Sequence, residues 1–207
     1  MSDVPWRLHG VLERSRANGP GTRFVVWTQG CDLGCAGCFN PGTHPDGDGS
    51  VQSVAELARQ VAAGADGIEG VTVTGGEPLQ QPDALREFVR LVRAETGLGI
   101  IVLSGYSRTE IEHDPVRHAA VAGADLVVAG RYTAARHLGS GLRGSSNKTY
   151  WNLTGRYDVS TFDDIPQGEI VVAADGTWTL TGVLGGAAGV RRQADPGGSG
   201  AQAGSRT

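Results

Sequence analysis

The sequence lacks the features that define three large classes of protein. No apolar run approaches the roughly 20 residues that span a bilayer. The first ten residues lack a basic segment followed by an apolar one, so we predict neither a membrane span nor a signal peptide. A formal net charge of −4 over 207 residues gives no support to a nucleic-acid surface. We therefore expect a cytoplasmic protein with no membrane and no nucleic acid among its partners.

Lysine and cysteine are also scarce. Arginine outnumbers lysine 17 to 1, which together with 33 glycines is typical of a GC-rich genome, and we draw no mechanism from it. The chain has 3 cysteines, Cys31, Cys35 and Cys38, and all of them lie within eight residues. Such a cluster is not the disulfide framework of a secreted protein, and it indicates a reducing compartment.

Strand and helix patterns alternate along the chain. Apolar stretches rich in β-branched residues predict strands, and amphipathic stretches between them predict helices, with Ser53 as one helix N-cap and Glu56 three residues later. The alternation predicts an α/β fold with a parallel sheet backed by helices, either doubly wound or part of a β/α barrel. We expect strands at residues 22–30, 70–76, 99–106 and 124–130, and helices at 53–64, 82–97 and 108–122.

The C-terminal part has a different pattern. Residues 168–182 predict a β-hairpin, with Asp175 and Gly176 in its turn. From about residue 185 the composition turns to Gly, Ala, Arg, Ser and Gln, with almost no large apolar side chain. We therefore expect one domain at residues 1–184, a partial (β/α) barrel of parallel strands with a C-terminal β-hairpin, followed by a disordered tail at 185–207.

The cysteine spacing allows three interpretations. The cysteines could be small buried apolar residues, although chance does not favour such clustering. They could bind zinc with His44 as a fourth ligand, although zinc knuckles usually space the ligands of each pair by two residues. They could hold an iron–sulfur cluster, which normally takes four thiolates. Three thiolates would leave one iron open to a small molecule, so this interpretation requires an odd number of cysteines.

A second motif favours the iron–sulfur interpretation. The spacing Cys-x3-Cys-x2-Cys is followed some forty residues later by "TGGEP", Thr74–Pro78, at the end of an expected strand. With these two motifs the sequence resembles the radical S-adenosylmethionine (SAM) superfamily. Glycines let the backbone approach a ligand closely, and Glu77 offers an acceptor for the ammonium group of the bound methionine. Both motifs follow strands, where β/α folds usually place their active sites.

Further stretches are similar to the glycyl-radical-enzyme activases, in particular the activases of anaerobic ribonucleotide reductase. The similarity covers roughly residues 6–182, and the last of these stretches is the most specific. They are "NGPGTRFVVWTQGC" (18–31), "CFNP" (38–41), "SGY" (104–106), and "DLVVAGRY" (125–132) followed by "RGSSN" (143–147).

The resemblance implies a metal-binding oxidoreductase with a 4Fe-4S cluster and S-adenosyl-L-methionine as cofactors. It implies that reduced flavodoxin or ferredoxin supplies an electron, that SAM is cleaved to a 5′-deoxyadenosyl radical, and that this radical takes a hydrogen atom from a glycine of a partner enzyme. It implies no catalytic acid or base. The implied cluster ligands are Cys31, Cys35 and Cys38. The implied cofactor-binding residues are Gly37, Phe39, Asn40, Thr74, Gly75, Gly76, Glu77, Pro78 and Ser104.

One departure from the activase pattern concerns the adenine site. The family usually has an aromatic residue just before the third cysteine, where this chain has Gly37, and Phe39 is the candidate to replace it.

We interpret the five histidines, His9, His44, His113, His118 and His137, as surface or packing residues. Arg143, Ser145, Ser146 and Asn147 either line the SAM or partner site or form a solvated loop.

Two alternatives stay open. The first is a radical SAM enzyme that acts on a small molecule, similar to 7-carboxy-7-deazaguanine synthase. That family tends to have Cys-Asp-Thr where this chain has Cys38-Phe39-Asn40. With only 3 cysteines the chain can hold no auxiliary cysteine-ligated cluster. The second alternative is a non-catalytic iron–sulfur or zinc protein, which would not bind SAM.

Overall fold

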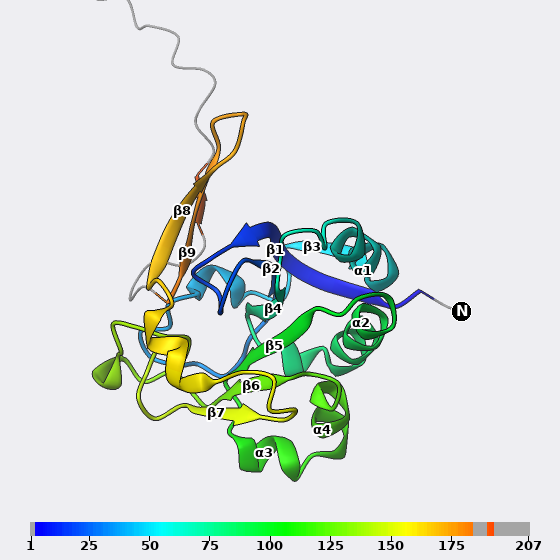
Figure 1. Cartoon of the computed structure of the whole chain (residues 1–207). Helices are drawn as coiled ribbons and strands as arrows, with labels where there is room; N and C mark the ends of the chain where they lie inside the picture. Colours follow the sequence, from blue (N-terminus) through cyan, green and yellow to red (C-terminus); the bar gives the residue numbers. More distant parts are fainter. Residues whose placement is uncertain (1–2, 184–189, 193–207) are drawn as a thin grey trace, which may run out of the picture.

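A seven-stranded mixed sheet organises the chain. The computed structural model describes residues 3–183 and 190–192 (Figure 1). The strand order is β3-β1-β2-β4-β5-β6-β7, in which β2, β4, β5 and β6 are parallel and the outer pairings are antiparallel. The strands are β1 (Pro5–Ser15), β2 (Arg23–Thr28), β3 (Ser50–Ser53), β4 (Gly70–Gly75), β5 (Gly99–Ser104), β6 (Leu126–Ala129) and β7 (Thr149–Asn152).

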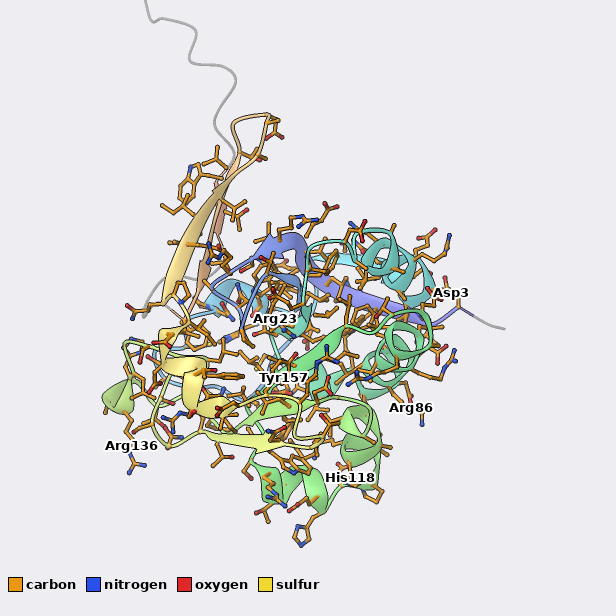
Figure 2. All side chains as sticks on the ribbon, viewed as in Figure 1. Asp3, Arg23, Arg86, His118, Arg136 and Tyr157 are labelled. Carbon is orange, nitrogen blue, oxygen red and sulfur yellow. The ribbon has the colours of Figure 1, made fainter. Side chains whose placement is uncertain are left out.

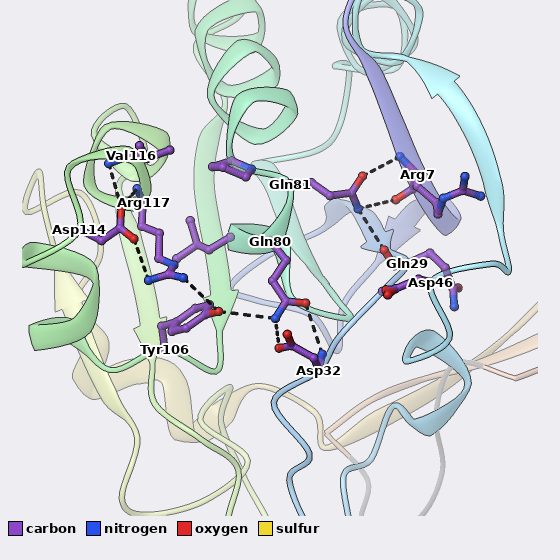
Figure 3. A pocket seen from close by; sticks show the side chains of 13 residues that line it. Arg7, Gln29, Asp32, Asp46, Gln80, Gln81, Tyr106, Asp114, Val116 and Arg117 are labelled. Atoms are coloured by element: carbon purple, nitrogen blue, oxygen red, sulfur yellow. Dashed lines mark hydrogen bonds and ion pairs between the residues drawn. The ribbon is translucent and has the colours of Figure 1, made fainter.

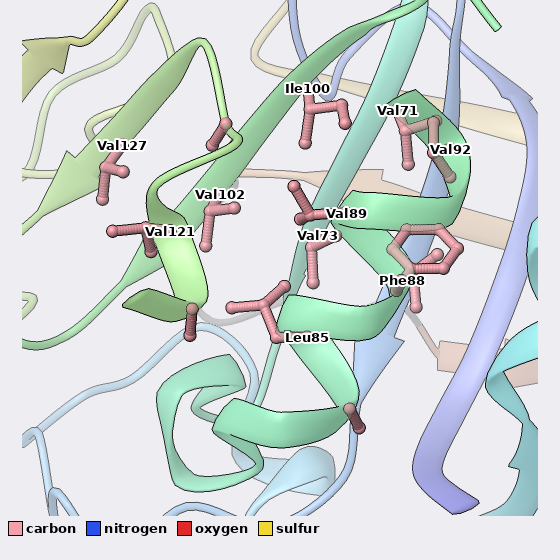
Figure 4. Packing of buried hydrophobic residues seen from close by; sticks show 14 of the residues in the cluster. Val71, Val73, Leu85, Phe88, Val89, Val92, Ile100, Val102, Val121 and Val127 are labelled. Atoms are coloured by element: carbon pink, nitrogen blue, oxygen red, sulfur yellow. The ribbon is translucent and has the colours of Figure 1, made fainter. Parts of the chain in front are cut away.

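The α-helices pack on one face of this sheet. Helix α2, with four apolar side chains on one side, covers valine and isoleucine side chains of β4 and β5 (Figure 4). The predicted N-cap is confirmed, because the Ser53 side chain accepts a hydrogen bond from the Glu56 N–H at the start of α1. The α-helices are α1 (Val54–Ala63), α2 (Pro82–Glu95), α3 (Arg108–Glu112) and α4 (Pro115–Val121).

The other face of the sheet is covered differently. In the described chain, Ile101, Leu103 and Val128 on this face pack against Leu142, in a loop, and Phe162, in a short 3₁₀ helix, and not against α-helices. The structure is therefore not a doubly wound sheet, which would carry helices on both faces. The short 3₁₀ helices are η1 (Pro41–Thr43), η2 (Pro78–Gln80), η3 (Ala134–Arg136) and η4 (Val159–Asp164).

The structure corrects two expectations for the elements. The single helix predicted at 108–122 is two helices, because Pro115 begins α4 and the Asp114 side chain caps it by accepting from Val116 and Arg117 N–H groups. The sheet is mixed rather than wholly parallel, because the unpredicted strands β1, β3 and β7 add antiparallel pairs. Strand order defines an open sheet and leaves its curvature undefined, so the partial barrel stays a prediction.

The predicted C-terminal hairpin is confirmed. Strands β8 (Gly168–Val172) and β9 (Trp178–Gly182) pair antiparallel, and Gly176 in the turn has a φ of 82°. The hairpin projects beside the main sheet (Figure 1). Within the predicted tail the structure describes only β10 (Val190–Arg192), which pairs with β9. The rest of residues 185–207 lies outside the described part, so disorder there stays a prediction.

A buried arginine joins the beginnings of three parallel strands. Arg23, at the start of β2 and fully buried, donates from Nε to Thr72 Oγ1 at 2.7 Å and from Nη2 to the carbonyl oxygens of Val71 and Gly99 at 2.7 and 2.9 Å. Its Nη1 lies 3.1 Å from the Tyr157 hydroxyl (Figure 2). Burial lowers the pKa of Arg23, which the nearby Tyr157 partly opposes. The planar guanidinium thus ties β2 to β4 and β5.

We predict that Arg23→Met destabilises the fold by about 3 kcal/mol, because it leaves two buried carbonyl groups and the Thr72 hydroxyl without their donor. Urea unfolding measures the change. Arg59→Met is the matched control, because Arg59 is exposed on α1, and it should alter stability by less than about 0.5 kcal/mol. Equal unfolding midpoints for the two variants would show that the Arg23 hydrogen bonds contribute nothing net.

Candidate functional site

A cavity lies at the carboxyl ends of the parallel strands. Five chain segments form it: the cysteine loop after β2, the turn after β4, the end of β5, the segment after β6, and the residue before β7. The cavity is small, with a volume of about 60 Å³. Its lining residues are Cys31, Leu33, Cys35, Cys38, Phe39, Asn40, His44, Thr74, Gly75, Gly76, Glu77, Leu103, Ser104, Gly105, Gly130, Tyr132 and Lys148.

The three cysteines converge on this cavity as free thiols. A backbone hydrogen bond from Cys38 N–H to the Cys35 carbonyl oxygen, 3.1 Å long, closes the loop between them. Burial raises the pKa of Cys31 to about 11, and burial also raises the pKa of Cys38. Metal binding deprotonates cysteine ligands, so both thiols must lose their protons when they bind iron.

The donor set fits a cluster better than a single zinc ion. His44 lines the cavity, but over the residues that the structure describes no three or more His, Cys, Asp or Glu side chains are placed around one metal ion. A structural zinc site needs four such ligands around one ion. In a 4Fe-4S cluster each thiolate binds a different iron, so the sulfur atoms need not meet at one point.

The Gly-Gly-Glu turn lies directly against the chain that enters the cysteine loop. Gly76 N–H donates to the Thr28 carbonyl oxygen and Glu77 N–H donates to the Gly30 carbonyl oxygen, each at 2.9 Å. A Cβ atom on Gly76 would overlap the Gly30 carbonyl oxygen, and Gly75 has a φ of 105°. The glycines are therefore needed for close packing against the protein's own backbone.

Glu77 is buried, and donors from its own chain satisfy it. Its Oε1 accepts from Leu79 N–H at 2.9 Å and from the Ser104 hydroxyl at 2.8 Å, and its Oε2 accepts from Gly105 N–H at 2.7 Å. Burial raises the pKa of Glu77, against the effect of these hydrogen bonds and of nearby Lys148. The carboxylate thus clamps the turn after β4 to the end of β5. Its role as an acceptor for a ligand ammonium stays a prediction.

An aromatic pair forms one wall of the cavity. The rings of Phe39 and Tyr132 meet edge to face with centroids 5.1 Å apart, and both side chains are buried. Gly144 packs against the Phe39 ring, where an added Cβ would lie 3.1 Å from a ring carbon. Gly37 has a φ of 73°, and a Cβ there would lie 3.1 Å from the Ala134 side chain, so any other residue at this position would be strained.

Most of the predicted cofactor-binding residues come together, but two do not. Seven of the nine line the cavity: Phe39, Asn40, Thr74, Gly75, Gly76, Glu77 and Ser104. Gly37 is exposed and Pro78 begins η2, and neither residue lines the cavity. The ligand-binding roles of all nine stay predictions.

The segment containing "RGSSN" packs against the chain after β6, but none of its five residues lines the cavity and Ser146 is exposed. Ser145 is fully buried, and its hydroxyl accepts from Thr133 N–H at 3.2 Å. The Asn147 side chain donates to the Arg131 carbonyl oxygen at 2.9 Å. These bonds hold the segment against the chain after β6, and they place the following residue, Lys148, in the cavity.

The sequence analysis missed several lining residues, of which Lys148 carries a charge. One available signal was its uniqueness, because Lys148 is the single lysine in a chain with 17 arginines. Tyr132 lay in the quoted "DLVVAGRY" stretch and was not singled out. His44 lines the cavity, whereas His9 pairs with Gln29 and His118 stacks on Trp151, as expected of packing residues.

A second, wider pocket of about 640 Å³ adjoins the outer side of the cysteine loop (Figure 3). None of the predicted site residues lines it, although Gly30 and Asp32, the neighbours of Cys31, do. Within it Gln81 bonds to Arg7 and Gln29, and Gln80 bonds to Asp32. The cysteine loop therefore contributes residues to both cavities.

Comparison with known proteins places this chain among proteins that bind an iron–sulfur cluster. The chain belongs to the family described as the 4Fe-4S single cluster domain, which matches residues 17–151. An anaerobic ribonucleoside-triphosphate reductase-activating protein of Enterobacteria phage T4 is 30% identical over 144 residues, 66% of this chain and 88% of that one. A pyruvate formate-lyase-activating enzyme of Listeria monocytogenes is 40% identical over 102 residues, 45% of this chain and 40% of that one. The resemblance to glycyl-radical-enzyme activases is confirmed.

The extent of these similarities differs. The chain spans less than half the length of the pyruvate formate-lyase-activating enzymes of Listeria and Clostridium pasteurianum. Among solved structures, QueE from Escherichia coli has a TM-score of 0.42 and 16% identity over 50% of this chain and 53% of that one, which supports no argument. In the described part of the chain, no helix is both long and apolar enough to cross a membrane.

We predict that iron loading weakens on acidification. Because burial raises the pKa of Cys31 to about 11, iron competes with protons for this thiol and for Cys38, and the competition becomes harder as pH falls. Anaerobic reconstitution against a fixed chelator, from about pH 9 to about pH 6, should show progressively less bound iron. A Cys31→Ser variant should bind less iron at every pH. Constant loading of the native protein over this range would contradict the prediction.

We predict that Gly76→Ala displaces the cysteine loop, because its Cβ atom would overlap the Gly30 carbonyl oxygen. The expected cost is about 2 kcal/mol of unfolding free energy, together with reduced iron binding after reconstitution. Gly97→Ala is the control, because no atom lies within 4 Å of a Cβ placed there. Urea unfolding and iron analysis measure the two effects. Native iron content in Gly76→Ala would show that the loop tolerates the shift.

Proposed function

We propose that this protein is a radical SAM enzyme that generates a glycyl radical on a partner enzyme, such as an anaerobic ribonucleotide reductase. One observation carries the proposal. The cysteine loop, the Gly-Gly-Glu turn and the wall that follows "RGSSN", far apart in sequence, surround one cavity at the carboxyl ends of the parallel strands. The phage T4 reductase-activating protein, of which the alignment covers 88%, supports this choice of partner.

In this proposal Cys31, Cys35 and Cys38 hold a 4Fe-4S cluster through three of its irons. When bound, the cluster would supply an open iron for SAM and the electron that cleaves a carbon–sulfur bond of SAM. The products of this cleavage are methionine and a 5′-deoxyadenosyl radical. The protein binds and orients the cluster and SAM, and it shields them from competing reactions. The turn at Thr74–Glu77 and the end of β5 hold the methionine part, and Phe39 with Tyr132 offers an apolar wall to the adenine.

The proposal assigns no side chain as a general acid or base, because hydrogen-atom transfer to a carbon radical needs none. The electron comes from reduced flavodoxin or ferredoxin, and the hydrogen atom comes from the partner's glycine. The proposed fold is a partial barrel, and we propose that the glycine reaches the cavity at the carboxyl ends of its strands.

The first test is SAM cleavage. The protein is reconstituted anaerobically with iron and sulfide, reduced, and given SAM, and 5′-deoxyadenosine is quantified by mass spectrometry. We expect the native protein to form it, and Cys35→Ala, which lacks one cluster ligand, to form none. A native protein that holds a reduced four-iron cluster and yields no 5′-deoxyadenosine, with or without a partner, would overturn the proposal.

The second test identifies the hydrogen donor. An anaerobic ribonucleotide reductase labelled with α-deuterated glycine is added to the reduced protein with SAM. Deuterium in 5′-deoxyadenosine, together with a glycyl radical signal in electron paramagnetic resonance, is the expected result. Cleavage without deuterium transfer or a glycyl signal would instead support an enzyme that acts on another substrate.

A further inference from the structure

The chain's single lysine is buried in the candidate site. Lys148 is 6% exposed and lines the cavity with the three cysteines and Glu77. Its side-chain stem packs on Gly130, where an added Cβ would lie 3.5 Å from Lys148 Cγ. Gly130 has a φ of 124°, a conformation that favours glycine. The Lys148 stem therefore lies in ordinary van der Waals contact with the chain just after β6.

The surroundings of Lys148 are acidic. Glu77, Cys35 and Cys38 all act on its charge and favour the ammonium form, whereas burial disfavours it and lowers its pKa to about 8. Among the described residues that line the cavity, no arginine and no second lysine is present. Lys148 is therefore the cation that faces a carboxylate and two thiol groups in a poorly solvated space.

The negative charge of a cluster held by three thiolates would interact with the Lys148 ammonium. Reduction by one electron adds one negative charge to a site already surrounded by thiolates and by Glu77. Net charge and solvent exposure near a cluster are among the factors that set its reduction potential. A nearby buried ammonium stabilises the more negative, reduced state, and low solvation strengthens that effect.

We propose that the Lys148 ammonium raises the reduction potential of the cluster held by Cys31, Cys35 and Cys38, and that it also pairs electrostatically with Glu77. The inference rests on the proposed function because it assumes that the cluster binds there. Lys148 is a positioning residue for charge: it forms and breaks no bond, and the added electron resides on the cluster.

Redox titration of the reconstituted protein tests the first part. Lys148→Met keeps the apolar stem and removes the charge, and we expect an about tenfold lower ratio of reduced to oxidised cluster at a given potential, a shift of about 59 mV to lower values. Lys148→Arg, which keeps the charge, should have a reduction potential close to that of the native protein. Arg136→Met removes one positive charge from an exposed position at the periphery (Figure 2), and it should leave the potential unchanged.

The outcomes separate this inference from the proposed function. A native protein that binds no cluster would overturn the function. A normal cluster with equal potentials in the native protein and Lys148→Met would overturn the role of Lys148 and leave the function intact. An equal fall of the reduction potential in Lys148→Met and Arg136→Met would also overturn the role of Lys148, because the effect would then reflect net charge and not position.

A double-mutant cycle tests the pairing with Glu77 without any cluster. Unfolding of the metal-free native protein, Glu77→Gln, Lys148→Met and the double variant is compared. If the two groups interact, removing both should cost less than the sum of the single changes, by a factor of roughly five or more in the folding equilibrium constant. Additive effects would contradict the pairing. If Lys148→Met does not fold, Lys148→Gln takes its place in both experiments.

Discussion

The close approach of the turn after β4 to the chain entering the cysteine loop is the constraint on which the site depends. Two backbone hydrogen bonds of 2.9 Å join Gly76 to Thr28 and Glu77 to Gly30, and the missing side chain at Gly76 makes them possible. The loop that carries the thiols therefore begins at a position set by a neighbouring strand. Glu77 extends the same link to the end of β5 through Ser104 and Gly105.

Buried charges lie at both ends of the parallel strands. Arg23 joins the beginnings of β2, β4 and β5 by donating to backbone carbonyl groups. The Glu77 carboxylate joins the turn after β4 to the end of β5 by accepting from Ser104 and Gly105. Between them the strand residues are apolar and packed under α2. Because a buried polar group is stabilising only when its partners are present, these two residues favour one alignment of the strands.

The uneven covering of the sheet explains where the cavity lies. Helices shield one face, and irregular chain from the region after β6 to η4 covers part of the other. Such chain can supply side chains that regular elements do not bring to the strand ends, including Tyr132 and Lys148. The cavity wall is thus formed by the segments with the least regular structure, as is common for binding sites on a rigid scaffold.

The sequence alone determined the local chemistry: the three clustered thiols, the glycine turn forty residues later, the four parallel strands, the first two helices, and the hairpin turn at Asp175-Gly176. These features depend on residue type and spacing, which are visible in the order of residues. The four-residue strands β3 and β7 were too short to carry a periodic signal, and they form because neighbouring strands offer hydrogen-bonding edges. Only the tertiary structure decided that Glu77 is satisfied within the chain, that Gly37 lies outside the cavity lining, and that Lys148 lines the cavity with the thiols. Those outcomes depend on contacts between segments distant in sequence, and no local pattern encodes them.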